Sequence, residues 1–296
     1  MRNQACFMLL FITTISFSQL KSVIIDSETK ESIPFVNIWI NNENIGTSSN
    51  EKGEFQLKIK TPKIIVLSAI GYKTKKISSD SIKRNIELTP QLTQLDEVII
   101  TSKKKNKKLT IGKFRRSKIN FYFSCGKVPW ISARYFPYKE KYDNTPFLSK
   151  IRILTNSQVK DAKFNIRLYD VNEKGEPEGY IYNENILTFA KRGKKVTEIN
   201  VSDLNIKFPK KGFFIAIEWL IIDNNKHTYK YSYKNSKKKD IATSYEPNIG
   251  TLPSDTDKNS WIFSQGKWKK TWRNKGAIKK YKDKYNLIAI ELSLTN

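Results

Sequence analysis

Aromatic and cationic side chains are interleaved through the last third of the chain. Residues 226–286 contain 16 Lys and Arg against 5 Asp and Glu. Flat rings stack on the faces of pyranose sugars, while Lys and Arg bind carboxylate, sulfate or phosphate groups. This composition predicts a surface that binds an acidic glycan. Its candidate ligand-binding residues are Trp261, Trp268, Trp272, Lys269, Lys270, Arg273 and Tyr245.

A structural role explains the same tryptophans equally well. Trp261, Phe263 and Trp268 flank Gly266 as they would in a β-hairpin, and in that case the rings belong to a hydrophobic core. Exposure of the rings separates the two interpretations. If Trp261, Trp268 and Trp272 are all buried, the glycan surface is excluded.

Oxygen-bearing side chains gather just before this hairpin, at Asp255, Asp257 and Asn259. Hard cations such as Ca²⁺ prefer oxygen ligands. Ser260 stands where an EF-hand has its glycine, and Gly266 stands where it has its closing glutamate, so the loop is not an EF-hand. An irregular calcium site and an ordinary turn both remain open. No other metal and no organic cofactor is expected.

The scarcity of histidine limits catalysis, because the chain contains only His227. A zinc carboxypeptidase site needs two histidines and a carboxylate. Ser-His-Asp chemistry would depend on this one residue, which lies in a polar stretch predicted to be a surface loop. No carboxylate pair stands out for glycoside cleavage. We therefore expect a protein without enzymatic activity, and keep an exported hydrolase of unknown type as the third hypothesis.

The elements that must position these residues follow an N-terminal segment that resembles an export signal. Arg2 precedes an apolar run from Ala5 to Ile15, and Ser16-Phe17-Ser18 forms a small-x-small cleavage pattern, so residues 1–18 are predicted to be a signal peptide. The run is shorter than a membrane-spanning helix requires, although a membrane anchor is the alternative. Cys6 lies inside the run, so no lipid anchor is expected. The mature chain would keep Cys125 alone and form no internal disulfide.

Charge is distributed unevenly along the chain. Residues 20–102 have a balance of +1, and residues 103–296 have a balance of +24. Such a basic region normally suggests nucleic acid as a partner. Export removes the protein from most nucleic acid, so anionic glycans or lipid head groups are the expected partners and nucleic acid is not. Abundant lysine also keeps β-rich surfaces soluble, which is the alternative reason for the charge.

Short apolar runs separated by turn residues predict β-strands throughout. Phe55, Leu57 and Ile59 alternate with polar residues, which is typical of a strand with one buried face. No segment shows a long helical period. The strands predicted before residue 102 are 20–26, 34–40, 54–59, 63–70, 72–77, 84–88 and 97–101. Their spacing indicates a β-sandwich.

The first third of the chain resembles the carboxypeptidase-like regulatory domain, a small prealbumin-like β-sandwich. Lys21-Ser22-Val23 stands where the family usually has a glycine before its first strand, which affects only the strand start. The segments that resemble the family are Ile25-Asp26, Ile33–Ile38, Gly46–Phe55, Ser68–Tyr72 and Ile86–Leu88. The resemblance implies an interaction module rather than a peptidase.

In many envelope proteins this domain precedes the plug and barrel of a TonB-dependent transporter, and residues 95–101 resemble its closing strand. Fewer than 200 residues follow here, which are too few for the roughly 22 strands of such a barrel. The resemblance therefore does not imply a transporter.

A run of lysines at residues 103–108 predicts a domain boundary. We expect a carboxypeptidase-like regulatory domain at 19–102, a basic linker at 103–109 and a second β-domain at 110–296. Contact of this run with anionic lipid is the alternative. The second domain is predicted to be a jelly-roll-like β-sandwich, with strands at 119–124, 131–136, 148–154, 162–171, 196–201, 213–222 and 287–292.

These features together predict an exported cell-envelope interaction protein, located in the periplasm, at the outer membrane or on the cell surface. In the first hypothesis the N-terminal sandwich docks to envelope proteins and the C-terminal one binds an acidic glycan. In the second, the protein is an accessory module of outer-membrane uptake or assembly that makes only protein contacts. Peripheral contact with the outer membrane is compatible with both.

Overall fold

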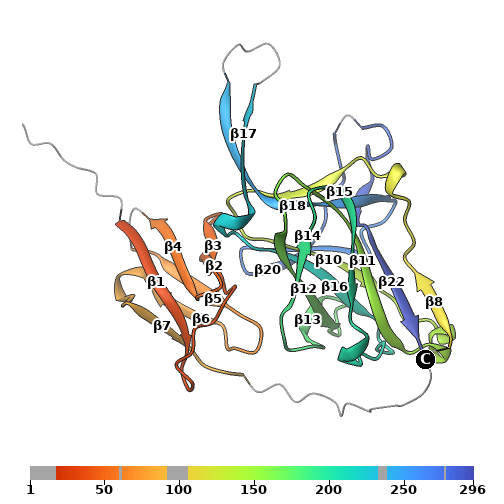
Figure 1. Cartoon of the computed structure of the whole chain (residues 1–296), viewed down its shortest axis with the longest axis horizontal. Helices are drawn as coiled ribbons and strands as arrows, with labels where there is room; N and C mark the ends of the chain where they lie inside the picture. The colour runs from red at the N-terminus through yellow and green to blue at the C-terminus, as the bar shows by residue number, and fades with distance from the viewer. Residues whose placement is uncertain (1–17, 60–61, 92–105, 233–238, 277) are drawn as a thin grey trace, which may run out of the picture.

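The computed structural model describes residues 18–59, 62–91, 106–232, 239–276 and 278–296. They form two β-sandwiches side by side (Figure 1), so the all-β prediction is confirmed. Within these ranges no helix is long and apolar enough to span a membrane. The described helices are short 3-10 turns: η1 (Ser79–Ser81), η2 (Arg116–Lys118), η3 (Glu140–Asn144), η4 (Ser202–Leu204) and η5 (Asp223–Asn225).

The first sandwich consists of two facing sheets with the strand orders β4-β1-β7 and β3-β2-β5-β6. β1 pairs antiparallel with β4 and parallel with β7. The strands are β1 (Ser18–Asp26), β2 (Asn37–Ile40), β3 (Gly46–Ser48), β4 (Glu54–Ile59), β5 (Ile64–Ser68), β6 (Lys75–Ser78) and β7 (Asn85–Leu88). This architecture is the prealbumin-like sandwich that the sequence resemblance implies.

Burial along β2 marks the side of the first sandwich that meets the second. In β4 buried and exposed residues alternate as predicted, but all four residues of β2 are buried. Ile38 and Ile40 belong to the core of the first sandwich. Asn37 and Trp39 point the other way and contact the second sandwich. A strand buried on both faces lies between two cores.

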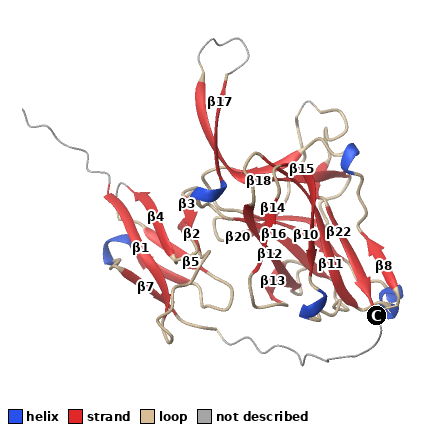
Figure 2. Ribbon diagram, viewed as in Figure 1, coloured by secondary structure: helices blue, strands red, loops and turns tan. Residues whose placement is uncertain are grey.

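The second sandwich has a front sheet with the order β13-β12-β16-β10-β19-β20, where β14 also pairs with β12. Its back sheet has the order β17-β18-β11-β22-β8, where β15 also pairs with β11, and β9 and β21 pair with β18. Successive strands such as β10, β11 and β12 alternate between the two sheets (Figure 2), which gives the jelly-roll-like architecture that was predicted.

The strands of the second sandwich are β8 (Lys108–Ile111), β9 (Tyr122–Cys125), β10 (Ile131–Phe136), β11 (Phe147–Ser157), β12 (Ala162–Val171), β13 (Pro177–Tyr180), β14 (Ile186–Ala190), β15 (Gly193–Asn200), β16 (Phe213–Trp219), β17 (Lys226–Tyr231), β18 (Asp240–Ser254), β19 (Ser260–Ser264), β20 (Lys267–Lys270), β21 (Tyr285–Ile288) and β22 (Ile290–Thr295).

β16 lies at the centre of the front sheet, between β12 and β10. All seven of its residues are buried. Phe213, Ile215 and Ile217 pack into the core between the two sheets. Phe214 and Ala216 face the outer side, where they join a second, smaller apolar cluster. The outer face of the front sheet is therefore covered rather than solvated, and this face holds the candidate site.

A two-stranded arm stands away from the body of the second sandwich (Figure 1). It consists of β17 and residues 240–245 of β18, paired in antiparallel register from Lys226 opposite Tyr245 to Tyr231 opposite Asp240. We had predicted His227 to lie in a surface loop, and it lies instead in β17 as part of this arm.

Several predicted boundaries differ from those of the structure. The expected linker at 103–109 ends earlier, because β8 begins at Lys108 and half-buried Leu109 packs against the core. The strand predicted at 287–292 is divided at Ala289 into β21 and β22. The predicted strand at 97–101 lies outside the described residues, as does the predicted signal peptide except for Ser18.

Candidate functional site

The two sandwiches meet through an apolar contact and hydrogen bonds between side-chain hydroxyls and the backbone. Phe35 of the first sandwich is buried against Leu220 and Ile222 of the second. The backbone N–H of Ile221 donates to Ser48 Oγ over 3.0 Å, and Thr47 Oγ1 donates to the Ile221 carbonyl over 3.3 Å. Residues that follow β16 thus hold the first sandwich against the second.

A buried polar network lies beside this apolar contact. Arg167 of β12 and Glu218 of β16 are 2% and 4% exposed. Arg167 Nε and Nη2 lie 2.8 and 2.5 Å from Glu218 Oε2, and Asn165 Nδ2 donates to the same oxygen over 3.1 Å. Asn37 of the first sandwich donates to Glu218 Oε1. Arg167 Nη1 donates to Asn185 Oδ1 over 2.6 Å.

This network leaves the ion pair fully engaged. Burial is the largest single effect on Arg167 and opposes its charge, but the attraction of Glu218, Tyr180 and Tyr169 and the hydrogen bond to Glu218 together raise the Arg167 pKa. A buried charge is tolerated when it is paired and hydrogen-bonded. Because Asn37 supplies one donor, the two domains share a single buried polar cluster.

A cleft with two chambers follows the domain boundary. The first chamber has a volume of about 310 Å³ and the second about 210 Å³. Ala69, Ile70 and Arg167 line both chambers, so the chambers are neighbours. The side chains that distinguish the first are Asp26, Glu31, Tyr72 and Asn185, and those of the second are Asn37, Tyr169, Glu178, Tyr180, Glu218, Phe263 and Trp268.

A hydrogen-bonded pair forms part of the first chamber. Tyr72 donates from its hydroxyl to Asp26 Oδ2 over 2.9 Å, and Asp26 Oδ1 accepts from the N–H groups of Glu28 and Thr29. Those backbone bonds are the main reason why the pKa of Asp26 lies below its ordinary value. Burial and the bond to Asp26 raise the pKa of Tyr72 to about 12.

Aromatic rings line the second chamber. Trp268 of β20 stands edge-on to Tyr169 at 5.1 Å between ring centroids and lies 5.3 Å from Phe263. Tyr169 lies 4.8 Å from Tyr180. Trp39 of the first sandwich meets Phe263 edge-on at 6.2 Å. These rings belong to the outer face of the front sheet, where the first sandwich covers only part of the aromatic cluster.

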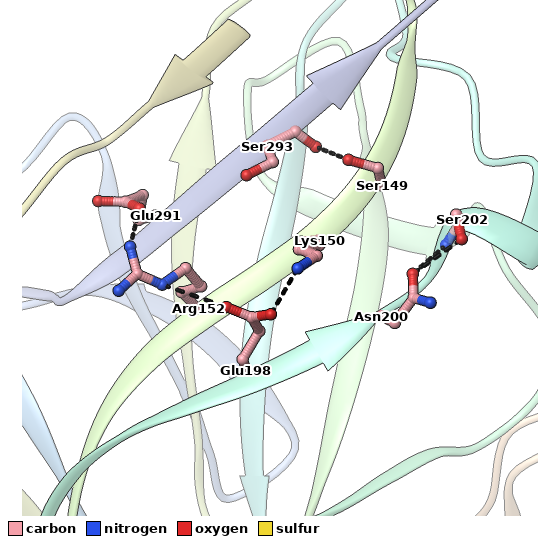
Figure 3. Close-up of polar contacts among 8 residues, drawn as sticks. All are labelled: Ser149, Lys150, Arg152, Glu198, Asn200, Ser202, Glu291 and Ser293. Atoms are coloured by element: carbon pink, nitrogen blue, oxygen red, sulfur yellow. Dashed lines mark hydrogen bonds and ion pairs between the residues drawn. The ribbon is translucent and has the colours of Figure 1, made fainter. Parts of the chain in front are cut away.

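The outer face of the back sheet has the opposite character. Arg152 is paired with Glu291 and with Glu198, and Lys150 Nζ lies 2.6 Å from Glu198 (Figure 3). These side chains come from the neighbouring strands β11, β15 and β22. The charges in this ladder neutralise one another. The aromatic front sheet is therefore the better candidate for ligand binding.

The three candidate tryptophans differ in how far they are buried. Trp261 is 5% exposed and belongs to the outer cluster of the front sheet, with Lys270 Nζ 3.8 Å from the centre of its ring. Trp268 is half-buried in the cleft, and Trp272 is 60% exposed. The predicted hairpin around Gly266 is the β19–β20 pair. The three rings do not form one platform, but they are not all buried either.

The cationic candidates lie on or just after β20. Lys269 and Arg273 are exposed, and Arg273 Nη1 donates to the Asp283 carbonyl over 2.9 Å while its guanidinium stacks 5.0 Å from the ring of Tyr285. Burial against Trp261 lowers the pKa of Lys270. Tyr245 does not join this group, because it pairs with Cys125 of β9 in the back sheet.

The candidate calcium loop holds its acidic residues apart. Asp255 forms an ion pair with Lys284, and the carbonyls of Asp257 and Asn259 accept backbone hydrogen bonds from Ser260 and Tyr135. Throughout the described part of the chain, no three His, Cys, Asp or Glu side chains gather closely enough to hold a metal ion. The structure thus pairs Asp255 with Lys284, a residue outside the loop, and uses the carbonyls of Asp257 and Asn259 in backbone hydrogen bonds.

His227 and Cys125 belong to residue types that are often reactive, but their surroundings indicate structural roles. His227 Nδ1 lies 3.7 Å from Oε1 of Glu246, a carboxylate whose pKa burial raises. Cys125 is fully buried in the core, and burial raises the pKa of its thiol. Reactive cysteines need a lowered pKa and exposure, so Cys125 packs as an apolar side chain.

Sequence reasoning did not identify Arg167, Glu218 or Asn37. Arg167 alternates with the apolar residues of β12, a pattern that favours exposure to water, while Glu218 is the single acidic residue in an apolar strand. An acidic residue between Ile217 and Trp219 was the available signal, because a charge in a central strand requires a partner.

Comparison with known proteins identifies one part of the chain. Residues 20–100 match the family model of the CarboxypepD_reg-like domain. No curated protein matches the chain. Two solved structures of Cwp84 show a distant likeness at 14% sequence identity. One contains the cysteine protease and lectin-like domains of this surface-layer-associated protein of Clostridium difficile, with a TM-score of 0.35 over 85% of this chain and 45% of that one.

The other is the clostridial cysteine protease after propeptide cleavage, with a TM-score of 0.34 over 85% of this chain and 50% of that one. The chain thus spans half or less of these proteins' own length. A T=1 particle derived from infectious bursal virus matches at 8% identity with a TM-score of 0.22, over 88% of this chain and 58% of that one. These TM-scores are too low to support an argument about fold or function. The family match and the structure agree, and residues 20–100 are a CarboxypepD_reg-like domain joined to a second β-sandwich.

Proposed function

We propose that this chain is an exported, non-enzymatic binding protein of a bacterial cell envelope, and that its second domain binds an acidic glycan. In this proposal the CarboxypepD_reg-like domain is a non-catalytic module, and its role is to dock to other envelope proteins. The N-terminal pattern of residues 1–18 supports export. The glycan surface consists of Trp272 with Lys269 and Arg273.

The observation behind this proposal is the exposure of Trp272 within a strongly basic segment. Its side chain is 60% exposed, although large aromatic residues are usually buried. Residues 267–284 contain nine Lys and Arg against one Asp. An exposed indole offers a flat face to a pyranose ring, and neighbouring cations attract its carboxylate or sulfate groups.

Arg273 gives the surface a defined geometry. The hydrogen bond to the Asp283 carbonyl and the stacking on Tyr285 hold the guanidinium in place. A fixed guanidinium binds a carboxylate with two parallel hydrogen bonds and loses little conformational entropy on binding. Trp261 contributes no free ring face, since Lys270 covers it, so we assign it to the support of the hairpin.

A binding experiment with purified full-length protein tests this function. We expect binding to acidic glycans on an array, little binding to neutral polymers, and a loss of affinity as salt is raised. Trp272→Ala and Arg273→Gln should each weaken binding at least about tenfold. Phe189→Ala is the matched control, because Phe189 is also a large exposed residue, at 47%, outside the basic segment. Equal binding by Trp272→Ala and the parent protein would reject the surface.

The arm favours a second candidate function, the docking of a partner protein. Tyr229 and Ile241 on the arm are 43% and 68% exposed. β17 is an edge strand in the described sheet, and an exposed edge offers its backbone groups to a strand of another protein. An isolated two-stranded hairpin is only marginally stable in water. A partner strand that pairs with β17 would stabilise the arm.

Site-specific crosslinking distinguishes the second candidate from the first. A photoreactive residue in place of Tyr229 is expected to give one discrete protein adduct in the native cell envelope. Ile241→Ser should abolish that adduct without changing glycan binding. The same label at Phe189 serves as control, and equal adduct formation at both positions speaks against docking through the arm.

A further inference from the structure

We propose that the second chamber of the interdomain cleft is a separate binding site for one uncharged sugar ring. The site lies between the CarboxypepD_reg-like domain and the front sheet of the second domain. Tyr180, Phe263 and Trp268 form its walls, and Asn37 lies among its polar residues. It differs in place and in chemistry from the basic surface around Trp272.

The engaged ion pair makes a neutral ligand the suitable one. Two nitrogens of Arg167 contact Glu218 and the third donates to Asn185, so each guanidinium nitrogen already has an acceptor and Glu218 balances the charge. Glu218 already accepts from Arg167, Asn165 and Asn37. The remaining charged side chain in the lining is Glu178, which is exposed and repels anions. An anionic ligand would thus gain no counter-charge here.

Asn37 supplies a hydrogen-bond acceptor that lacks a partner. The residue is 8% exposed, and its Nδ2 donates to Glu218. Its Oδ1 is buried and has no hydrogen-bond partner among the described residues. Buried polar atoms are normally hydrogen-bonded. A hydroxyl group of a ligand in the chamber is the kind of donor that Asn37 Oδ1 requires.

The aromatic walls suit the apolar face of a pyranose. Trp268 and Tyr180 are only half-buried, so part of each ring faces the cleft. Contacts with Tyr169 hold both rings in place, at centroid distances of 5.1 and 4.8 Å. A volume of about 210 Å³ lies below the range of roughly 300–1,000 Å³ that is typical of sites for drug-sized ligands. The chamber therefore fits a single ring and not a chain.

Titration of the full-length protein with neutral monosaccharides tests the site. Glucose, galactose, mannose and N-acetylglucosamine are the probes, and binding is followed by calorimetry and by saturation-transfer NMR. The titrations are run at high salt, where binding of acidic glycans at Trp272 is suppressed. We expect at least one of the sugars to bind with an affinity that does not change with salt. Failure of either proposal can thus be recognised independently of the other.

Variants then test whether the sugar binds in the second chamber. Trp268→Leu removes one wall but leaves every hydrogen bond of the Arg167–Glu218 network, and it should weaken sugar binding at least about tenfold. Asn37→Ser removes the acceptor and should have a similar effect, although it also removes a bond to Glu218. Trp272→Ala is the matched control and should leave binding unchanged.

Three outcomes overturn this inference. If none of the four sugars binds, or if Trp268→Leu binds as well as the parent protein, the chamber holds only solvent. If free phenylalanine or tyrosine binds and the sugars do not, the chamber accepts a side chain of a protein, and the assigned ligand class is wrong.

Discussion

Glu218 is buried yet accepts hydrogen bonds from three different side chains, those of Arg167, Asn165 and Asn37. Desolvation of a carboxylate costs free energy, and the cost is offset only where partners replace the lost water. One of the three donors belongs to the other domain. Glu218 therefore balances the charge of Arg167 within the front sheet and, through Asn37, also joins the two sandwiches.

Removal of the buried cation should destabilise the protein strongly. Arg167→Ala leaves Glu218 buried beside neutral amides, and we expect the free energy of unfolding to fall by about 3–5 kcal/mol. Lys150→Ala is the control, because Lys150 belongs to the exposed ladder of the back sheet, where loss of a pair costs less than about 1 kcal/mol. Urea unfolding measures both. Similar losses for the two variants would mean that the buried pair adds nothing beyond a surface pair.

The hydrogen bonds that Asp26 accepts, from the backbone of Glu28 and Thr29 and from the hydroxyl of Tyr72, make stability depend on pH at both extremes. The folded-state pKa of Asp26 is lowered, so its contribution is present above the ordinary carboxyl pKa and is lost as pH falls through the folded value. The pKa of Tyr72 is raised to about 12, so its contribution is present below the ordinary value of about 10 and is lost as pH rises toward 12. Tyr72→Phe should be less stable than the parent protein at neutral pH.

The difference in stability between Tyr72→Phe and the parent protein should shrink between pH 10 and 12, because the ionised Tyr72 of the parent can no longer donate to Asp26. Thermal unfolding midpoints across this range check the prediction. A constant difference through pH 12 would show that the hydroxyl contributes no proton to the bond.

The period of two predicted β12 correctly but misplaced its polar residues. Phe164, Ile166 and Leu168 are buried in the core as expected, while Asn165 and Arg167 are buried too, on the opposite face. Alternation indicates which residues share a face of a strand. It contains no information about whether another domain covers that face, and the network at the cleft was therefore not predictable from one strand.

At the scale of elements, β18 shows that residues which usually end strands can prevent the prediction of a strand from sequence. β18 extends over 15 residues although it contains Pro247, Gly250 and Pro253. Its pairing shifts register with β9 between Tyr245 and Ile249, and its last part pairs with β21 instead. Proline is tolerated at such irregular positions. Proline and glycine therefore prevented the prediction of β18, the longest described strand. The predicted bounds of β10 and β12, whose residues alternate clearly, match those of the structure.

The arm should be the least protected part of the second sandwich. All residues of β17 except half-buried His227 are exposed, and few apolar contacts hold the strand. Amide hydrogens of Thr228–Tyr231 are expected to exchange much faster with deuterium than those of β16, whose seven residues are all buried. Exchange monitored by mass spectrometry provides the comparison. Protection of the arm equal to that of β16 in the purified protein would require a further contact that covers it.

At the scale of the whole molecule, the two sandwiches differ in charge but share a boundary. The first third of the chain is nearly neutral and the remainder has a balance of +24. The boundary is built from apolar contacts, the buried network and an ion pair between Lys163 and Glu51. This arrangement leaves the basic segment after β20 free of the first domain's acidic residues, and it places the cleft where both domains contribute walls.

Phe35 is the side chain whose loss should uncouple the domains. It is 6% exposed and packs on Leu220 and Ile222, outside the core of its own sandwich. Phe35→Ala therefore removes buried apolar area from the boundary, a change that costs about 3–5 kcal/mol when a phenylalanine is fully buried. Ile45→Ala is the control, because Ile45 is an apolar residue of the same domain that is 41% exposed.

Calorimetry should show one cooperative transition for the parent protein and for Ile45→Ala. In Phe35→Ala the first sandwich should unfold at a lower temperature than the second, because each sandwich keeps its own core but the energy that couples them is reduced. The same variant should weaken sugar binding in the cleft, since the cleft requires both domains, while acidic-glycan binding at Trp272 persists. A single transition with an unchanged midpoint would mean that the boundary does not couple the sandwiches.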